Sequence, residues 1–175
     1  MSFARVRALA IVGVLVTCAA ILVAVTLFKD RQRGPVNEQS CPKNAVIADV
    51  RLPEPRDVKI VFFDATGTSN TAANVRAELR HRQFQVTRSE EPLERTDKVA
   101  VLRYGPKAVG SAWLLRAYFL NTAETAFAIE RTDDTVDVVL GGGFKKLATA
   151  TEVGQALAQL GRPQEPSGTC VNERT

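Results

Sequence analysis

The residues of this chain that could do chemistry are few, and they form no recognisable catalytic pattern. His81 is the only histidine, and it stands between Arg80 and Arg82 near the end of a predicted helix. A catalytic histidine needs a nucleophile within hydrogen-bond reach, and the sequence around it identifies none. A zinc site needs several closely spaced Cys or His ligands, which the sequence also lacks. We therefore predict no catalytic residue, no metal site and no cofactor.

The best candidate for binding a ligand is the loop Thr66-Gly67-Thr68-Ser69-Asn70. It follows an apolar strand and precedes a helix, so its backbone N–H groups are suitably placed to hold a phosphate or a carboxylate. It lacks the phosphate-binding patterns GxxxxGK[ST] and GxGxxG. The same residues suit a turn that needs a glycine and a helix cap. The turn is the favoured interpretation, and contact with an anionic polymer is the functional alternative.

Two other features have a structural and a functional interpretation. The stretch Gly141 to Lys146 (GGGFKK) places two lysines beside a flexible turn, where they could meet a polyanion. A strand-ending turn with solvated lysines is the favoured interpretation. Trp113 and Tyr104 are aromatic residues that could stack on a sugar, but core packing explains them as well and is preferred.

The apolar stretch Ala8 to Phe28 has 21 residues and no charge. As a helix it would span about 32 Å, which matches a hydrocarbon core of about 30 Å. A cleaved signal peptide would have an apolar run of only about 7–15 residues before a small-residue cleavage site, and Thr26-Leu27-Phe28-Lys29 does not supply one. We therefore predict a single-pass membrane anchor, with Cys18 inside the lipid phase.

Two of the three cysteines lie outside this stretch, at positions 41 and 170. They bracket the region beyond the anchor, and an even pair in an extracytoplasmic domain favours a disulfide between Cys41 and Cys170. Two unrelated free thiols are the alternative. Flanking charge does not decide the orientation of the anchor, so the cysteines and the length of the C-terminal region favour a domain outside the cell.

The charge of the chain is concentrated beside the anchor. The net charge is +4, from 23 basic and 19 acidic residues. Five basic residues and one acidic residue precede Pro35, so the remainder carries 18 of each. A domain without net charge lacks the excess of basic residues that is typical of a nucleic-acid-binding protein. Lys29, Arg31 and Arg33 are better placed to meet lipid phosphates.

Apolar periodicity beyond Asp57 predicts a small α/β (α+β) domain. Strands are indicated where β-branched and aromatic residues run together, and helices where apolar residues recur every three or four positions. The expected strands are 58–63, 84–86, 99–104, 124–130 and 136–140, and the expected helices are 71–82, 107–120 and 149–160. A four- or five-stranded mixed sheet packed by two or three helices is the economical arrangement.

These expectations divide the chain into five parts. They are a short cytoplasmic tail (1–7), a transmembrane helix (8–28), a linker (29–56), an extracytoplasmic domain (57–160) and a C-terminal tail (161–175). The linker is assigned from its polar residues and its four prolines. Within it, the apolar patch 45–48 can dock on the domain as an extra strand or turn.

The runs VFFDATGTSNTAANVRAELRHRQFQV, VAVLRYGP and VDVVLGGGF resemble the LytR C-terminal domain family. The resemblance covers about 57–145. Matching positions are Thr66, Gly67, Ser69, Ala72, Phe84, Val86, Tyr104, Gly105, Leu140 and Gly141. The chain departs from the pattern at Asp64, Ala65, Asn70, Thr71 and Gln83; Ala65, Asn70 and Gln83 stand where the family has glycine.

The resemblance implies a role in maintaining the cell envelope. It implies no catalysis, because the ligase activity of larger relatives lies in a different domain, and it carries over no active-site residues. We therefore expect a membrane-anchored binding or scaffolding protein that contacts a cell-wall polymer or another envelope protein. Two alternatives remain open, an envelope enzyme acting on a wall substrate and an inward-facing adaptor with reduced thiols.

Overall fold

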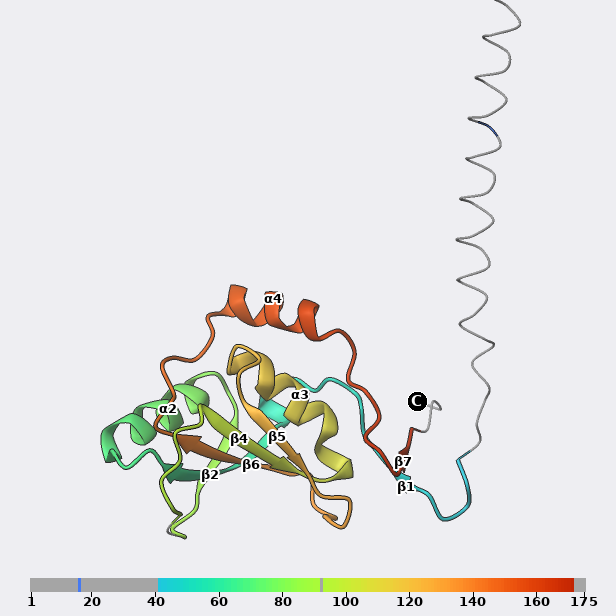
Figure 1. Cartoon of the computed structure of the whole chain (residues 1–175), viewed down its shortest axis with the longest axis horizontal. Helices are drawn as coiled ribbons and strands as arrows, with labels where there is room; N and C mark the ends of the chain where they lie inside the picture. Colours follow the sequence, from blue (N-terminus) through green and yellow to red (C-terminus); the bar gives the residue numbers. More distant parts are fainter. Residues whose placement is uncertain (1–15, 17–40, 92, 172–175) are drawn as a thin grey trace, which may run out of the picture. The chain divides into compact units, whose positions relative to one another are not determined.

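The computed structural model describes Val16, residues 41–91 and residues 93–171. The chain divides into two units, Met1–Ser40 and Cys41–Thr175, and the second unit contains the elements labelled in Figure 1. The anchor predicted at 8–28 lies outside the described residues except for Val16. Within the described ranges, none of the helices combines the length and the apolar character that crossing a membrane requires.

A five-stranded mixed sheet forms the centre of the second unit, and its strands follow the order β3-β2-β6-β4-β5. β2 is parallel to both neighbours, β6 is antiparallel to β4, and β5 is parallel to β4. The expectation of a mixed sheet is confirmed, with five strands. Their bounds are β2 Lys59–Ala65, β3 Gln85–Arg88, β4 Ala100–Tyr104, β5 Glu124–Phe127 and β6 Thr135–Gly141.

One face of the sheet carries the main hydrophobic core. Helices α2 (Ser69–His81) and α3 (Val109–Tyr118) both pack there, and α3 follows a 3-10 turn, η2 (Pro106–Ala108). The side chains that alternate toward this face are apolar and almost fully buried, as the pleat of a strand requires. They include Ile60 and Phe62 from β2, and Val136 and Val138 from β6. A third helix, α4 (Ala150–Leu160), packs on α3 and forms an outer layer (Figure 1).

The other face of the sheet has no helix among the described residues. A smaller apolar cluster of Phe63, Ala65 and Val139 lies there, with Leu93 packed against it. Leu93 belongs to the charged loop that joins β3 to β4. Because this loop covers apolar side chains of β2 and β6, β2 is flanked by packing on both faces, as its continuous apolar sequence predicts.

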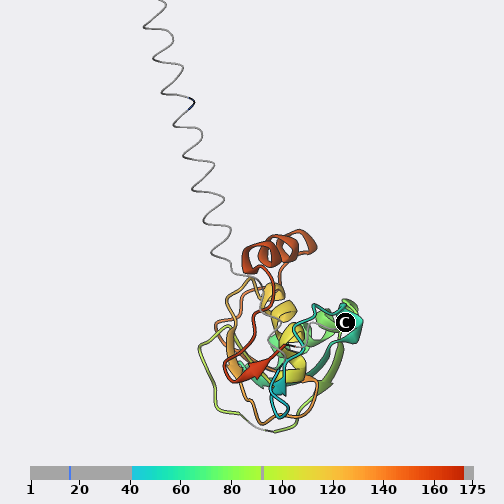
Figure 2. The same ribbon diagram turned by 90° about the vertical axis from the view of Figure 1, so that its right-hand side faces the viewer.

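A second, two-stranded parallel sheet pairs the two ends of the unit. β1 (Val46–Ile47) pairs with β7 (Thr169–Cys170), so segments far apart in sequence lie side by side (Figure 2). Beside them, Cys41 and Cys170 form a disulfide with their Cα atoms 5.9 Å apart. The predicted bridge is therefore confirmed.

The predicted linker and tail are corrected by this arrangement. The compact unit begins at Cys41 rather than at Asp57, and Ala48 is 3% exposed. Residues 41–57 contain two short elements, β1 and the 3-10 turn η1 (Pro55–Asp57), and are otherwise irregular, so they have no periodic apolar pattern. The tail likewise includes β7, so both segments belong to the domain.

Candidate functional site

The predicted ligand loop, residues 66–70, connects β2 to α2, and its polar groups are bonded to one another. The backbone N–H and the hydroxyl of Thr66 both donate to Asp64 Oδ1, at 3.0 and 2.8 Å. The backbone N–H of Thr68 donates to Thr66 Oγ1 at 3.0 Å. The Asp64 carboxylate thus accepts from both donors of Thr66, and an anionic ligand at Thr66 would have to replace it. This geometry favours the turn interpretation.

Gly67 is required by the conformation of the same loop. Its φ is +73°, in the left-handed region that favours glycine. A Cβ atom at this position would also collide with the guanidinium end of Arg95. Thr68 and Asn70 are exposed, and Ser69 begins α2. The structure therefore brings the predicted loop residues together as a compact turn.

The glycine-rich stretch after β6 lies at the same end of the sheet, since Ala65 and Gly141 are register partners. The N–H groups of Gly142 and Gly143 donate to the carbonyls of Thr96 and Lys98, at 2.7 and 3.1 Å. A Cβ at Gly141 or Gly143 would collide with the backbone of residues 96–98. Gly141 and Gly143 are needed because residues 141–143 pass close to the backbone of residues 96–98.

Three other residues that the sequence singled out, Lys146, Trp113 and Tyr104, have structural partners. Lys146 forms an ion pair with Glu152 at 2.6 Å. Trp113 Nε1 donates to the carbonyl of Gly161 at 3.1 Å, and the Arg116 guanidinium lies 5.0 Å from the centre of the Trp113 ring. Tyr104 packs against Phe127, with ring centres 5.7 Å apart, and burial raises the pKa of its hydroxyl. His81 is exposed at the last position of α2.

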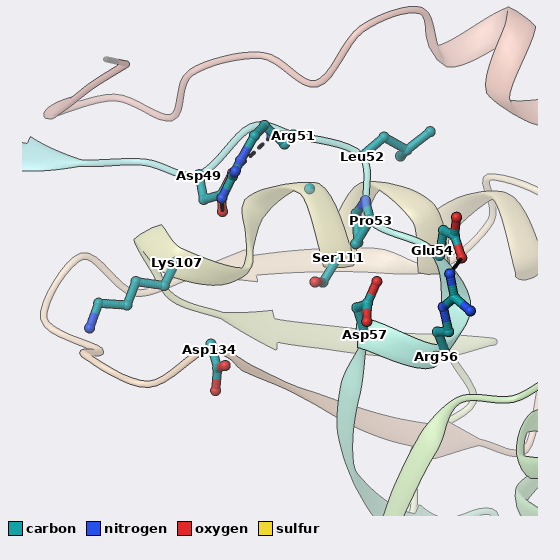
Figure 3. A pocket seen from close by; sticks show the side chains of 11 residues that line it. Asp49, Arg51, Leu52, Pro53, Glu54, Arg56, Asp57, Lys107, Ser111 and Asp134 are labelled. Carbon is teal, nitrogen blue, oxygen red and sulfur yellow. Dashed lines mark hydrogen bonds and ion pairs between the residues drawn. The ribbon is translucent and has the colours of Figure 1, made fainter. Parts of the chain in front are cut away.

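A groove with a volume of about 520 Å³ lies at the opposite end of the sheet (Figure 3). Asp57 precedes β2 and Asp134 precedes β6, so the groove opens where these two parallel strands begin. The η2 turn and the start of α3 form its other side. Its lining comes from three segments, namely Asp49, Arg51, Leu52, Pro53, Glu54, Arg56 and Asp57, then Lys107, Gly110 and Ser111, and finally Asp134.

The wall formed by residues 49–57 is held in place by backbone contacts. The N–H of Asp49 donates to the carbonyl of Pro106 at 2.8 Å, and the N–H of Gly110 donates to the carbonyl of Asp49 at 2.9 Å. A Cβ at Gly110 would collide with the Arg51 carbonyl. At the far end of the wall, the Gln85 side chain donates to the carbonyl of Arg56 at 2.6 Å.

The turn that carries Asp134 is held by Arg131. The two terminal nitrogens of this guanidinium contact Asp137 at 2.7 Å and Asp133 at 2.9 Å. These hydrogen bonds raise the pKa of Arg131 above its usual range, and they hold the pKa of the Asp133 carboxyl well below its own. Both charged partners therefore stay ionised at neutral pH, so the turn beside the groove is fixed.

Most charges that line the groove are already paired. Arg51 pairs with Asp49 at 2.8 Å, which lowers the pKa of the Asp49 carboxyl. Arg56 pairs with Glu54 at 2.6 Å. Asp134 pairs at 2.7 Å with Lys59, which lowers the pKa of the Asp134 carboxyl. Within residues 41–91 and 93–171, no three His, Cys, Asp or Glu side chains gather so as to hold a metal ion.

Sequence reasoning did not find this groove. Its lining residues come from positions that are separated by dozens of residues and share no motif. The one available signal was the apolar patch 45–48, in the segment before Asp57, which predicted that this part of the segment could dock on the domain. That docking places the following residues, from Asp49 onward, against the start of α3.

Comparison with known proteins gives three findings. Residues 57–144 match the family described as LytR cell envelope-related transcriptional attenuator. The cell envelope integrity protein Cei of Mycobacterium tuberculosis is 28% identical, over 88% of this chain and 79% of its own length. The solved soluble domain of a conserved hypothetical secreted protein from Mycobacterium marinum is 26% identical with a TM-score of 0.50, over 69% of this chain and 83% of that domain.

Proposed function

We propose that this chain, which belongs to the LytR C-terminal family, is a membrane-anchored binding or scaffolding protein of the cell envelope. In this proposal the anchor is the apolar stretch Ala8 to Phe28, and the domain 41–171 faces the outside of the cell. There it contacts a cell-wall polymer or another envelope protein. The proposed activity is binding, without catalysis.

The family match carries this proposal because of the part of the fold that it covers. Residues 57–144 contain all five strands of the central sheet and the two helices that pack on it. The match therefore concerns the core rather than a single motif. Cei is named for cell envelope integrity, and its similarity extends over 88% of this chain, including regions on both sides of the matched core.

Two observations support the external location. A disulfide between Cys41 and Cys170 closes the domain, and such bridges form and persist in oxidising compartments. The similar domain from Mycobacterium marinum is described as part of a secreted protein. An anchor that ends at position 28 leaves residues 29–40 to connect the membrane to the first bridged cysteine.

A deletion of the gene in its own organism tests the envelope role. We expect the deletion strain to become more sensitive to detergents and to wall-active drugs, and the intact chain to restore resistance. A chain that lacks residues 1–28 but is exported by a cleavable signal is the matched control for anchoring. Unchanged sensitivity of the deletion strain would contradict the proposal.

Protease treatment tests the location separately. Protease added to whole cells should cleave the domain while a cytoplasmic marker survives. Cleavage only after lysis would show an inward-facing domain. Thiol labelling with and without reductant gives an independent readout, because the bridged Cys41 and Cys170 become reactive only after reduction.

A further inference from the structure

We propose that the groove between residues 49–57 and the start of α3 binds a short peptide that carries both a free ammonium group and a free carboxylate. The inference goes beyond the proposed function, which concerns a polymer or a protein partner, because it adds a small ligand bound by the same domain. Its evidence is independent of the family match and comes from the shape and the charges of the groove (Figure 3).

Two opposite charges on the groove remain available. Three ion pairs account for the other charged residues of the lining. Lys107 and Asp57 remain, and neither has an oppositely charged partner within the described part of the chain. Both side chains are exposed. They come from different walls. In Figure 3 Asp57 lies beside Ser111, whereas the Lys107 side chain extends from η2 away from both of them. The groove thus presents one positive and one negative group at separate places.

The charge balance of the lining decides between classes of ligand. Arg51, Arg56 and Lys107 face four acidic residues, Asp49, Glu54, Asp57 and Asp134, and Lys59 neutralises the last of these from outside the lining. A polyanion therefore finds no positive field here, whereas an extended ligand with opposite charges at its two ends matches Asp57 on one wall of the groove and Lys107 on the other. Complementary charge arrangement of this kind contributes specificity more than affinity.

The dimensions and the apolar rim of the groove suit a peptide. Binding sites for ligands of drug size typically have volumes of about 300–1,000 Å³, and this groove falls inside that range. Leu52, which is 48% exposed, and Pro53 offer apolar surface to a short side chain. The backbone contacts of residues 49–57 already hold the wall in place, so binding does not have to order it.

Isothermal titration calorimetry with trialanine tests the inference on the full-length chain in lipid nanodiscs. We expect saturable millimolar binding of trialanine with free termini, and a loss of binding when both termini are capped by acetyl and amide groups. Asp57→Asn and Lys107→Gln should each weaken binding by about two- to fivefold, as for exposed ion pairs. Lys145→Gln changes an exposed lysine outside the groove and is the matched control.

The two singly capped forms of the peptide test which residue of the groove meets which charge of the peptide. N-acetyl trialanine should bind equally to the parent chain and to Asp57→Asn, because the ammonium group that Asp57 meets is gone. Trialanine amide should in the same way be insensitive to Lys107→Gln. Equal affinity for free and doubly capped trialanine, or binding of polyglutamate in their place, would overturn the inference. An envelope defect in the deletion strain would still uphold the proposed function in that case.

Discussion

The two ends of the central sheet differ in how their polar groups are used. At the carboxyl ends of β2 and β6, the loop 66–70 and the turn after Gly141 bond internally or to residues 96–98. At the amino ends of the same strands, a groove of about 520 Å³ remains open. The closed end contains the run of glycine and hydroxyl residues that resembles a site in the sequence, whereas the residues that line the open end share no motif.

The difference shows what local sequence patterns report. Gly67 and Gly141 are placed where the chain turns through a left-handed conformation or passes close to another segment, so their pattern reports backbone constraints. Gly110 at the open end meets the same kind of constraint, since a Cβ there would collide with the Arg51 carbonyl, but it stands within a helix and not in a glycine-rich run. The groove depends on the docking of residues 49–57, which the disulfide and β1 tether at one end.

Removal of the disulfide is expected to have the largest effect, and to act first on the open end. Cys41→Ser should lower the free energy of unfolding by about 4–5 kcal/mol, the loop-closure value for a bridge of this span, since 129 positions separate the cysteines. Thermal unfolding under oxidising conditions measures it. Cys18→Ser, which removes a cysteine outside the bridge, is the control.

Hydrogen exchange on the same variant tests the comparison directly. The amide of Gly110, bonded to Asp49, should exchange faster than in the parent chain, by a larger factor than the amide of Gly142, bonded to Thr96. Local opening of a less stable segment explains such a contrast. Equal acceleration at both ends would mean that the bridge stabilises the domain as a whole rather than the wall of the groove.

An added methyl group tests the closed end. Gly143→Ala places a Cβ against the backbone of Asp97, and overpacking of this kind costs about 1–3 kcal/mol. Gly154→Ala is the matched control, because a Cβ at this position in α4 meets nothing within 4 Å. It should stabilise by roughly 0.5–1 kcal/mol through helix propensity. Urea unfolding of both variants should show changes of opposite sign in the free energy of unfolding.

The sequence was sufficient to predict the elements that local periodicity determines. The strand at 58–63, the helix at 71–82 and the start of α4 at its capping box all appear, the last with reciprocal bonds between Thr149 and Glu152. The docking of residues 41–57 was not predictable in the same way. Its prolines and short irregular contacts carry no period, and its stabilising partners, such as Pro106, are remote in sequence.

A smaller effect is expected at Gln83, on the turn between α2 and β3, at the end of the sheet where the groove lies. Its φ is +73°, as for Gly67 at the closed end, but the residue is not a glycine. Gln83→Gly should therefore raise the free energy of unfolding by roughly 0.5–1 kcal/mol, since relief of backbone strain exceeds the added entropy of the unfolded chain. Urea unfolding measures the change.

Gly67→Gln is the reciprocal variant, and it should destabilise the domain by about as much as Gln83→Gly stabilises it. A Cβ at this position meets the guanidinium end of Arg95, which is flexible and can move aside, so the left-handed backbone is the main cost. A much larger loss of stability for Gly67→Gln would mean that Arg95 is held in place and that its close contact also requires the glycine.

The smallest expected effect on stability concerns Lys146, and tests whether this lysine is held in an ion pair within the domain. Lys146, together with the bonds from Thr149, lowers the pKa of the Glu152 carboxyl to about 2, from an ordinary 4.5. A carboxyl whose pKa is lowered on folding stabilises the fold above its unfolded pKa, and the stabilisation is lost as pH falls through the folded pKa.

Glu152→Gln keeps a side chain that can complete the capping box and removes only the charge. The parent chain should therefore unfold at a slightly higher temperature than this variant at neutral pH, and the difference should shrink between pH 4.5 and about 2. Thermal unfolding of both proteins across that range measures it. A difference that does not depend on pH would mean that Lys146 is not held by Glu152. Lys146 would then be available to an anion, as the functional interpretation of residues 141–146 requires.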